Sequence, residues 1–215
     1  MEDFLKQMMN DHRDFDHGKL EGFFGDTPFN LFSEWYKEAY ETAQPEPNAF
    51  VLSTVDKNNR PSSRILYLKA MSDNNFVFFT NYNSHKGKDL ESNNNASMLF
   101  FWPGKERQVR IEGEVVKISE DESDAYFESR PRSSQVGAWA SHQSEFLEER
   151  DDLESRLKDY AEKFTDEVPR PPHWGGYMLQ PRLIEFWQGR PSRLHDRIVF
   201  ELKEDGVWKI YRKNP

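Results

Sequence analysis

The sequence predicts a mainly β protein with peripheral helices, an α+β fold in which antiparallel strands form a closed or nearly closed barrel. Between residues 49 and 118, segments rich in β-branched and aromatic residues alternate with turn sequences. More strand-like segments follow residue 176, and segments with helix signals precede and separate the two strand regions. Strands therefore dominate the expected fold, with the helices inserted around them.

The first expected helix begins at Thr27-Pro28, because threonine can cap a helix and proline suits its first turn. Apolar residues then recur at helical spacing until the proline-containing segment 44–47 ends the helix. A capping box of Ser119 and Glu122 predicts another helix that extends to residue 130. Three further helices are expected over residues 84–93, 135–140 and 145–164.

The expected strands are short and are joined mostly by turns rich in Asn, Asp, Gly and Pro. Six or seven strands suit one barrel of this size, and the first 25 residues are mixed polar and typical of a flexible arm. In chain order, the strand segments are 49–55, 62–70, 76–80, 96–102, 107–118, 176–188, 197–203 and 207–212.

Composition excludes several classes of protein. Lys and Arg total 29 and Asp and Glu total 38, so the formal net charge is −9, which repels nucleic acid and anionic membrane surfaces. The absence of Cys excludes disulfides, thiolate nucleophiles and Cys-ligated metal. The apolar stretch 96–102 is far shorter than the roughly 20 residues of a membrane span, and the polar N-terminus is no signal peptide. We expect a cytoplasmic protein without nucleic-acid or membrane partners.

An anionic ligand of so acidic a protein must be captured by local groups of basic residues. One group lies in the expected strand 64–69, where Arg64 and Lys69 fall on opposite faces. A second, 84–88, opens a helix, where free N–H groups and Lys86 suit a phosphate. The third, 126–134, combines arginines with hydroxyl groups. Taken alone, each segment is also consistent with a solvated basic surface.

The segment 184–197 is less ordinary, because Arg193 and Arg197 flank His195 beside a strand end that carries Trp187. Such a group can hold an anionic aromatic ligand and shift its proton chemistry. No second His lies at zincin spacing, so no metal site is expected. The sequence has neither a Gly-x-Ser-x-Gly elbow nor a Gly-x-Gly-x-x-Gly motif after a strand, which removes support for a hydrolase triad and for Rossmann dinucleotide binding.

The run IEFWQGRPSRLHDR closely resembles the signature of pyridoxine (pyridoxamine) 5′-phosphate oxidases. The resemblance extends from about residue 27 to residue 215, through RILYLK, SHKGKDLE, ERQVRIEG, YFESRPRSSQVGAWASHQS and WGGY in the same order. It implies an FMN-binding split β-barrel of Greek-key type over residues 27–215, a homodimer with FMN at its interface, and an N-terminal arm over 1–26 that covers the substrate.

The resemblance also implies an activity in vitamin B6 biosynthesis and salvage. Members of the family oxidise pyridoxamine 5′-phosphate or pyridoxine 5′-phosphate to pyridoxal 5′-phosphate. Molecular oxygen reoxidises the flavin and yields hydrogen peroxide, and the amine substrate also releases ammonia. Both FMN and the substrate carry phosphate, which agrees with separate basic groups in an acidic protein.

Site residues follow from the matching motifs. The resemblance makes Arg193, His195 and Arg197 the catalytic group, with the arginines fixing the ring and stabilising negative charge while His195 orients it. The implied FMN contacts are Arg64, Ile65, Leu66, Tyr67, Leu68, Lys69, Phe79, Thr80, His85, Lys86, Gln108, Gln143, Ser144, Trp187 and Arg197. The implied substrate contacts are Lys69, Tyr126, Arg130 and Ser134 at the phosphate, Arg193, Leu194 and His195 at the ring, and His12, Arg13, Asp14 and Phe15 in the lid.

Some positions depart from the family pattern. His85 stands where the family usually has Arg, and both Phe79 and Phe15 replace Tyr, so neither supplies a hydroxyl. Two alternatives stay open: another FMN-dependent oxidoreductase of the same barrel class, and a non-catalytic carrier of flavin or pyridoxal phosphate. A non-phosphorylated substrate would not need Arg130, and a carrier would not need polar groups facing the ring.

Overall fold

The computed structural model describes residues 14–16, 18–22, 24–42 and 45–215, which divide into two compact units. The first unit contains the described residues up to Pro47 together with Leu99–Ile111 and Leu183–Pro215. The second contains Asn48–Met98 and Glu112–Arg182. Three long strands pass from one unit into the other, namely β5 (Asn95–Trp102), β6 (Arg107–Lys117) and β7 (Trp174–Gln188).

The predicted mainly β fold with inserted helices is confirmed. The strands form one sheet in the order β2-β1-β5-β6-β7-β4-β3, and β8 pairs with both β7 and β9. The remaining strands are β1 (Ala49–Val55), β2 (Pro61–Tyr67), β3 (Ala70–Ser72), β4 (Asn75–Asn81), β8 (Asp196–Leu202) and β9 (Trp208–Arg212). The α-helices of the described residues are α2 (Pro28–Glu41), α3 (His85–Ser92), α4 (Glu120–Glu128), α5 (Arg132–Ala140) and α6 (Arg150–Lys163).

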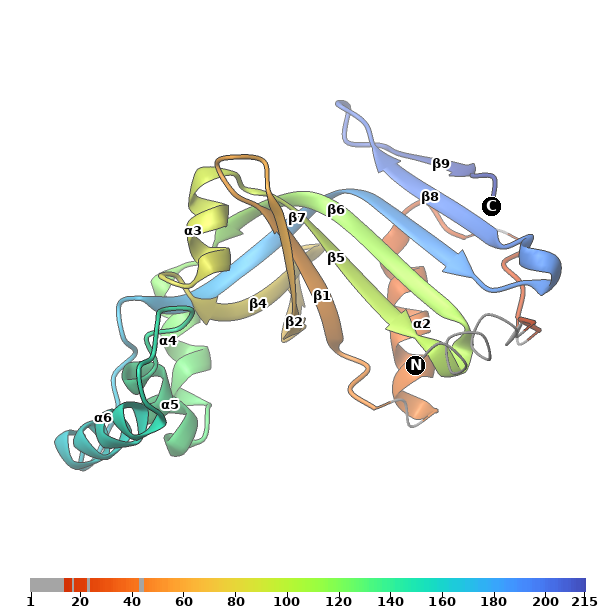
Figure 1. Ribbon diagram of the computed structural model, residues 1–215. Helices are drawn as coiled ribbons and strands as arrows, with labels where there is room; N and C mark the ends of the chain where they lie inside the picture. The colour runs from red at the N-terminus through yellow and green to blue at the C-terminus, as the bar shows by residue number, and fades with distance from the viewer. Residues whose placement is uncertain (1–13, 17, 23, 43–44) are drawn as a thin grey trace. The chain divides into compact units, whose positions relative to one another are not determined.

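The first unit is built on the apolar face of α2. Phe32 packs edge-on against Phe100 with ring centroids 5.3 Å apart, and Trp35 packs edge-on against Phe186 at the same distance. Pro28 occupies the first turn as predicted, whereas the side chain of Thr27 makes no capping hydrogen bond. Antiparallel pairing joins the C-terminal part of β7 to β8, and β8 to β9 (Figure 1).

The second unit contains the antiparallel hairpin β1–β2 and the pairing of β4 with the N-terminal part of β7. Its helices α4, α5 and α6 lie together in Figure 1, and Phe127 and Trp174 belong to the apolar cluster there. The capping box of Ser119 and Glu122 is present at the start of α4. Gly87 in α3 is required by close packing, because a Cβ atom there would lie 2.0 Å from the carbonyl oxygen of Tyr82.

Two predicted elements differed most in extent from the structure, and the helix expected over 135–140 also begins earlier, at Arg132. The strand expected over 62–70 is divided into β2 and β3, because the N–H of Leu68 donates to Asn48 and that of Lys69 donates to Val77. The chain thus changes its partner from the β1 side to β4 between these residues, so the described residues form nine strands where eight segments were expected, more than the six or seven strands thought to suit one barrel. The helix expected from residue 145 begins at Arg150, with Asp151 and Asp152 in its first turn. No helix in the described ranges is both long and apolar enough to cross a membrane.

Candidate functional site

Lys86 is the buried centre of a polar cluster, here called the Lys86 cluster, that also contains Thr80, Ser84 and Gln143. The Lys86 ammonium donates to Ser84 Oγ at 3.0 Å and to Gln143 Oε1 at 2.8 Å. Thr80 Oγ1 donates to the same amide oxygen at 3.3 Å. Burial and the nearby charge of Arg64 lower the pKa of Lys86 to about 8, although Asp89 opposes this shift. Three predicted cofactor residues from separate segments, Thr80, Lys86 and Gln143, therefore meet.

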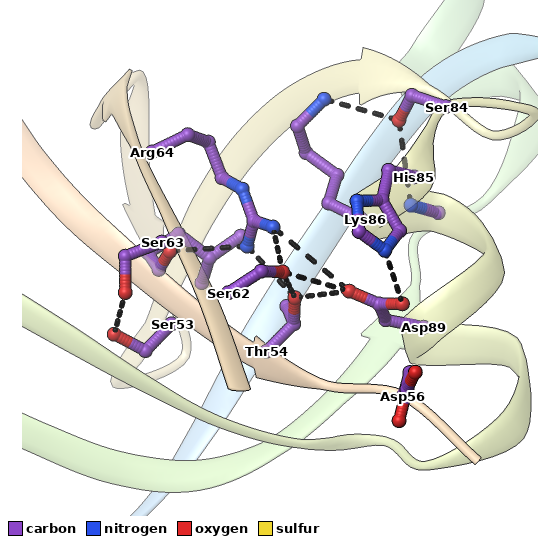
Figure 2. Close-up of polar contacts among 12 residues, drawn as sticks. Ser53, Thr54, Asp56, Ser62, Ser63, Arg64, Ser84, His85, Lys86 and Asp89 are labelled. Atoms are coloured by element: carbon purple, nitrogen blue, oxygen red, sulfur yellow. Dashed lines mark hydrogen bonds and ion pairs between the residues drawn. The ribbon is translucent and has the colours of Figure 1, made fainter. Parts of the chain in front are cut away.

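Arg64 lies in a second network, which centres on the buried carboxylate of Asp89 (Figure 2). Arg64 Nη1 donates to Thr54 Oγ1 at 2.8 Å, and Thr54 Oγ1 donates to Asp89 Oδ2 at 2.6 Å. Arg64 Nη2 lies 3.9 Å from Asp89 Oδ2, and His85 Nε2 lies 3.5 Å from Asp89 Oδ1. Burial lowers the pKa of Arg64, and Asp89 opposes that shift. Sequence reasoning missed Asp89, although its position four residues after His85 places both on one helix face.

These residues fit a phosphate group. Ser84 caps α3 by accepting the N–H of Gly87, and the helix N-terminus favours an anion. The buried ammonium of Lys86 uses two of its three N–H donors in the cluster, so one is left. The second unit thus provides two cations and a helix N-terminus of the kind that binds the phosphate of a cofactor.

Tyr126, Phe79 and Trp174 form a group of stacked rings, with the Phe79 centroid 3.8 Å from that of Tyr126 and 5.6 Å from that of Trp174. The Arg130 guanidinium carbon lies 4.5 Å from the centroid of the Trp174 ring. Arg130 Nη1 is buried and has no hydrogen-bond partner among the described residues. Burial lowers the pKa of Arg130, and Tyr126 opposes the shift. A buried guanidinium with an unused donor fits a second anionic group.

In the first unit, His195 packs against Trp187 with ring centroids 4.6 Å apart, and Phe15 lies edge-on to both rings. His195 Nδ1 accepts the backbone N–H of Arg190 at 3.2 Å, which leaves the proton of the neutral ring on Nε2. Burial and the charge of Arg193 lower the pKa of His195. The structure therefore brings together His195, predicted for the ring, Phe15, predicted for the lid, and Trp187, predicted to contact FMN.

The N-terminal segment also contacts the loop that carries Arg193. Asp14 Oδ1 accepts the N–H of Ser192 at 3.1 Å, and both Ser192 and Arg193 have positive φ, 56° and 60°. Arg197 forms a two-point ion pair with Glu185, a residue that sequence reasoning missed. Glu185 lies two residues before Trp187 and therefore on the same strand face, and this spacing was the signal from which it could have been predicted as a site residue.

The other predicted residues are placed separately. Lys69 is exposed with its ammonium 5.4 Å from the Tyr67 ring, and Ser144 is exposed with φ 70°. His12 and Arg13 lie outside the described residues. On and just after β2, Ile65 is exposed, Leu66 is half-buried and Leu68 is buried. Elsewhere in the chain, Gln108 and Ser134 are half-buried and Leu194 is exposed.

Comparison with known proteins assigns the family. A family model described as pyridoxamine 5′-phosphate oxidase matches residues 36–164, and one described as the pyridoxine 5′-phosphate oxidase C-terminal dimerisation region matches residues 174–215. A relative from Cupriavidus necator named pyridoxine/pyridoxamine 5′-phosphate oxidase is 56% identical over 188 residues, covering 87% of this chain and 89% of its own length. A relative of the same name from Paraburkholderia phytofirmans is 52% identical over 189 residues, with the same coverage.

Two solved structures are also similar. PhzG from Burkholderia lata, in complex with tetrahydrophenazine-1-carboxylic acid, has a TM-score of 0.85 at 30% identity and covers 92% of this chain and 100% of its own. An FMN-binding protein from Nostoc punctiforme related to pyridoxamine 5′-phosphate oxidase has a TM-score of 0.70 at 18% identity, covering 88% and 98%. This second likeness confirms the predicted split-barrel fold. On these matches the chain is an oxidoreductase that belongs to the pyridoxamine 5′-phosphate oxidase family.

Proposed function

We propose that this chain binds FMN and oxidises pyridoxamine 5′-phosphate and pyridoxine 5′-phosphate to pyridoxal 5′-phosphate, with O2 as acceptor. The reaction releases H2O2, and ammonia from the amine, and serves vitamin B6 biosynthesis and salvage. The observation that carries the proposal is the buried Nη1 of Arg130 on Trp174, which has no hydrogen-bond partner in the described ranges and accompanies the Lys86 cluster in the same unit. Two phosphorylated molecules require two anion sites, and the second unit offers both.

The phosphate of FMN is assigned to Lys86 and Arg64, with the N-terminus of α3. Ser84 and Gln143 hold the Lys86 ammonium in place, Thr80 donates to the same oxygen of Gln143, and Asp89 holds Arg64. FMN, when bound, supplies the acceptor for a hydride from the substrate C4′ carbon. This chemistry needs alignment more than a strong acid, so the protein contributes orientation and electrostatics.

The substrate phosphate is assigned to Arg130 and Tyr126, joined by Lys69 and Ser134. At the ring, His195 is neutral near pH 7 and offers its Nε2–H as a donor, because Nδ1 is already bonded to the Arg190 N–H. Arg193 and Arg197 stabilise negative charge that develops on the ring. Asp14 and Phe15 contact the loop and ring of this group, which supports their assignment to a substrate lid.

The proposed function also includes a homodimeric assembly and a division of the chain into an arm and one domain. The match of residues 174–215 to a dimerisation region supports a homodimer, with FMN at the subunit interface. Residues 27–215 are assigned to one FMN-binding domain and 1–26 to the arm that covers the substrate. The location of the protein is proposed to be the cytoplasm.

A second candidate is an FMN-dependent oxidoreductase of the same barrel class with another substrate. It is favoured by the likeness to PhzG, whose structure holds tetrahydrophenazine-1-carboxylic acid. The buried donor of Arg130 argues against it, because a substrate without phosphate would leave that group unused. The higher identity to the relatives named oxidase, 56% against 30%, points the same way.

The test is oxygen-dependent peroxide release by FMN-loaded protein given pyridoxamine 5′-phosphate, with unphosphorylated pyridoxamine as the control. Peroxide and pyridoxal 5′-phosphate from the phosphorylated compound alone are the expected result. A yellow protein that gives neither product would leave the flavin assignment standing and overturn the substrate. In that case another substrate, or a carrier role, becomes the assignment.

A further inference from the structure

Glu185 on β7 is a buried carboxylate with three basic partners. Its Oε1 accepts hydrogen bonds from Arg197 Nε at 3.0 Å and Arg197 Nη2 at 2.8 Å, and its Oε2 accepts from Nη2 at 2.9 Å. Arg110 Nη2 donates to Oε2 at 2.9 Å, and Lys213 Nζ lies 3.6 Å from the same oxygen. Glu185 is 4% exposed, so these cations compensate its charge in place of water.

Strand register explains why Glu185 reaches Arg197. Arg197 on β8 pairs with Trp187 on β7, and Glu185 lies two residues before Trp187 on the same face. Diagonal neighbours in an antiparallel pair are within reach of long side chains. Ile184 and Phe186 point to the opposite face, where both are fully buried. Glu185 is therefore not part of that apolar core.

The contacts fix the orientation of the Arg197 guanidinium. Besides the two nitrogens bound to Glu185, Nη1 donates to the carbonyl oxygen of Asn214 at 3.0 Å. A two-point contact with a carboxylate sets the plane of the guanidinium. Of the two N–H groups on Nη1, one has no partner among the residues that the structure describes and is left for another molecule. Three cations on one carboxylate also leave a formal excess of positive charge around Arg197.

We propose that Glu185 is a positioning residue, which holds the Arg197 guanidinium in one orientation toward FMN and the substrate ring. The inference rests on the proposed function, which assigns Arg197 to both molecules. A preorganised donor stabilises developing charge without a cost of reorientation during the reaction. Loss of the Glu185 charge frees the guanidinium to rotate, so the alignment is lost although Arg197 is still present.

A double-mutant cycle tests this role. Glu185→Gln keeps the size of the side chain and removes its charge. We expect Glu185→Gln to lower kcat by roughly 10- to 100-fold at saturating FMN, since misalignment of a reacting group has effects of this size. Residues that act as one unit are not additive, so the variant with both Glu185→Gln and Arg197→Ala is expected to lie within about twofold of Arg197→Ala alone.

A second readout does not depend on turnover. The visible circular dichroism of bound FMN reports the charged groups near the flavin, and we expect Glu185→Gln to change it in the same sense as Arg197→Ala. Glu38→Gln is the matched control, because Glu38 also pairs with two cations in the first unit, Arg107 at 2.9 Å and Lys105 at 3.5 Å. This control is expected to leave kcat and the flavin signal unchanged.

Several outcomes overturn the proposal. The first is an unchanged kcat in folded Glu185→Gln. The second is a kcat of the double variant that is reduced by the product of the two single-variant losses. The third is a circular dichroism spectrum of bound FMN that is the same in Glu185→Gln as in wild type. If Glu185→Gln does not fold, Glu185→Asp keeps the charge but shortens its reach, and the same cycle applies. Wild-type protein that binds FMN without turnover would overturn the proposed function, while the dichroism comparison still decides the role of Glu185. Failure of the wild type to bind FMN would overturn both.

Discussion

The guanidinium of Arg130 lies 4.5 Å from the ring centroid of Trp174, with its Nη1 buried and without a hydrogen-bond partner in the described part of the chain. An unsatisfied buried donor costs free energy, and more so when it is charged. Such a cost is tolerated where a ligand supplies the missing acceptor. Arginine stays protonated at neutral pH even when burial lowers its pKa, so the position is suited to a phosphate.

Arg130→Ala is expected to raise KM for pyridoxamine 5′-phosphate by roughly 10- to 100-fold, because hydrogen bonds to charged groups contribute about 1.5–3 kcal/mol. The absorption spectrum of bound FMN is expected to stay unchanged. Steady-state kinetics and flavin spectra measure both effects. Arg132→Ala is the matched control, because Arg132 donates to the backbone carbonyls of Phe164 and Asp166 and is expected to leave KM unchanged. Loss of FMN from Arg130→Ala would show that the two phosphate sites are assigned in the wrong order.

Lys86 makes FMN affinity dependent on pH. Its pKa is lowered to about 8, so in the protein without FMN its charge is lost as the pH rises through 8. FMN binding to the apoprotein, followed by quenching of flavin fluorescence, is expected to weaken between pH 7 and 9.5. In Lys86→Arg the charge persists over this range, so the dependence should flatten. An equally steep dependence in Lys86→Arg would contradict the assignment.

The lowered pKa of Lys86 also affects stability. The unfolded chain, with an ordinary lysine pKa of 10.5, binds the proton more tightly than the folded protein does. The free energy of unfolding of the apoprotein therefore gains a contribution as the pH rises from about 8 toward 10.5. This contribution is expected to be absent from Lys86→Met, and urea unfolding of both proteins at pH 7.5 and 9.5 measures the difference. Equal changes in the free energy of unfolding of the two proteins between these pH values would refute the contribution of Lys86.

Arg197→Ala is expected to reduce turnover far more than it reduces flavin content. Removing a preorganised donor lowers kcat by roughly 100- to 1000-fold, whereas Lys86 and Arg64 still hold the FMN phosphate. Flavin content per chain and kcat for pyridoxamine 5′-phosphate are measured on the same preparation. Unchanged turnover would rule out the catalytic role of Arg197.

His195 is expected to destabilise the protein in mild acid. Burial and Arg193 lower its pKa below the ordinary 6.5, so the unfolded chain binds this proton more tightly. Stability is therefore lost as the pH falls from about 6.5 through the lowered pKa. Thermal unfolding midpoints at pH 7.5 and 5.5 should differ less in His195→Gln than in wild type. If the midpoints at the two pH values differ by as much in His195→Gln as in wild type, the lowered pKa of His195 is contradicted.

Elements with strong local signals were predicted correctly from the sequence. Ser119 and Glu122 form the expected capping box, and the helix expected over 84–93 is present as α3. The division at Leu68 and Lys69 was missed, because it depends on hydrogen bonds to distant residues that no local pattern reveals. The late start of α6 was missed because 145–149 mix Glu with Phe146 and Leu147, a composition that does not distinguish this segment from the charged helix that follows it.

In the candidate site, too, the sequence did not reveal residues whose role depends on contacts with distant parts of the chain. The basic residues stood out in an acidic sequence, and Lys86, Arg130 and His195 were all identified. The acids that hold Arg64 and Arg197 were not identified, because a buried carboxylate is defined by the cations that face it. Asp89 is placed by Arg64 from another element, and Glu185 by Arg197 on the neighbouring strand. Sequence alone does not distinguish such acids from the many solvated ones.

The most direct measurement is the absorbance of protein-bound FMN after pyridoxamine 5′-phosphate is added without oxygen. The proposed function predicts rapid bleaching near 450 nm with one pyridoxal 5′-phosphate formed per flavin, and no bleaching with unphosphorylated pyridoxamine. Readmission of oxygen should restore the colour with release of peroxide. A flavin that stays oxidised in the presence of the phosphorylated amine would contradict the proposed reaction.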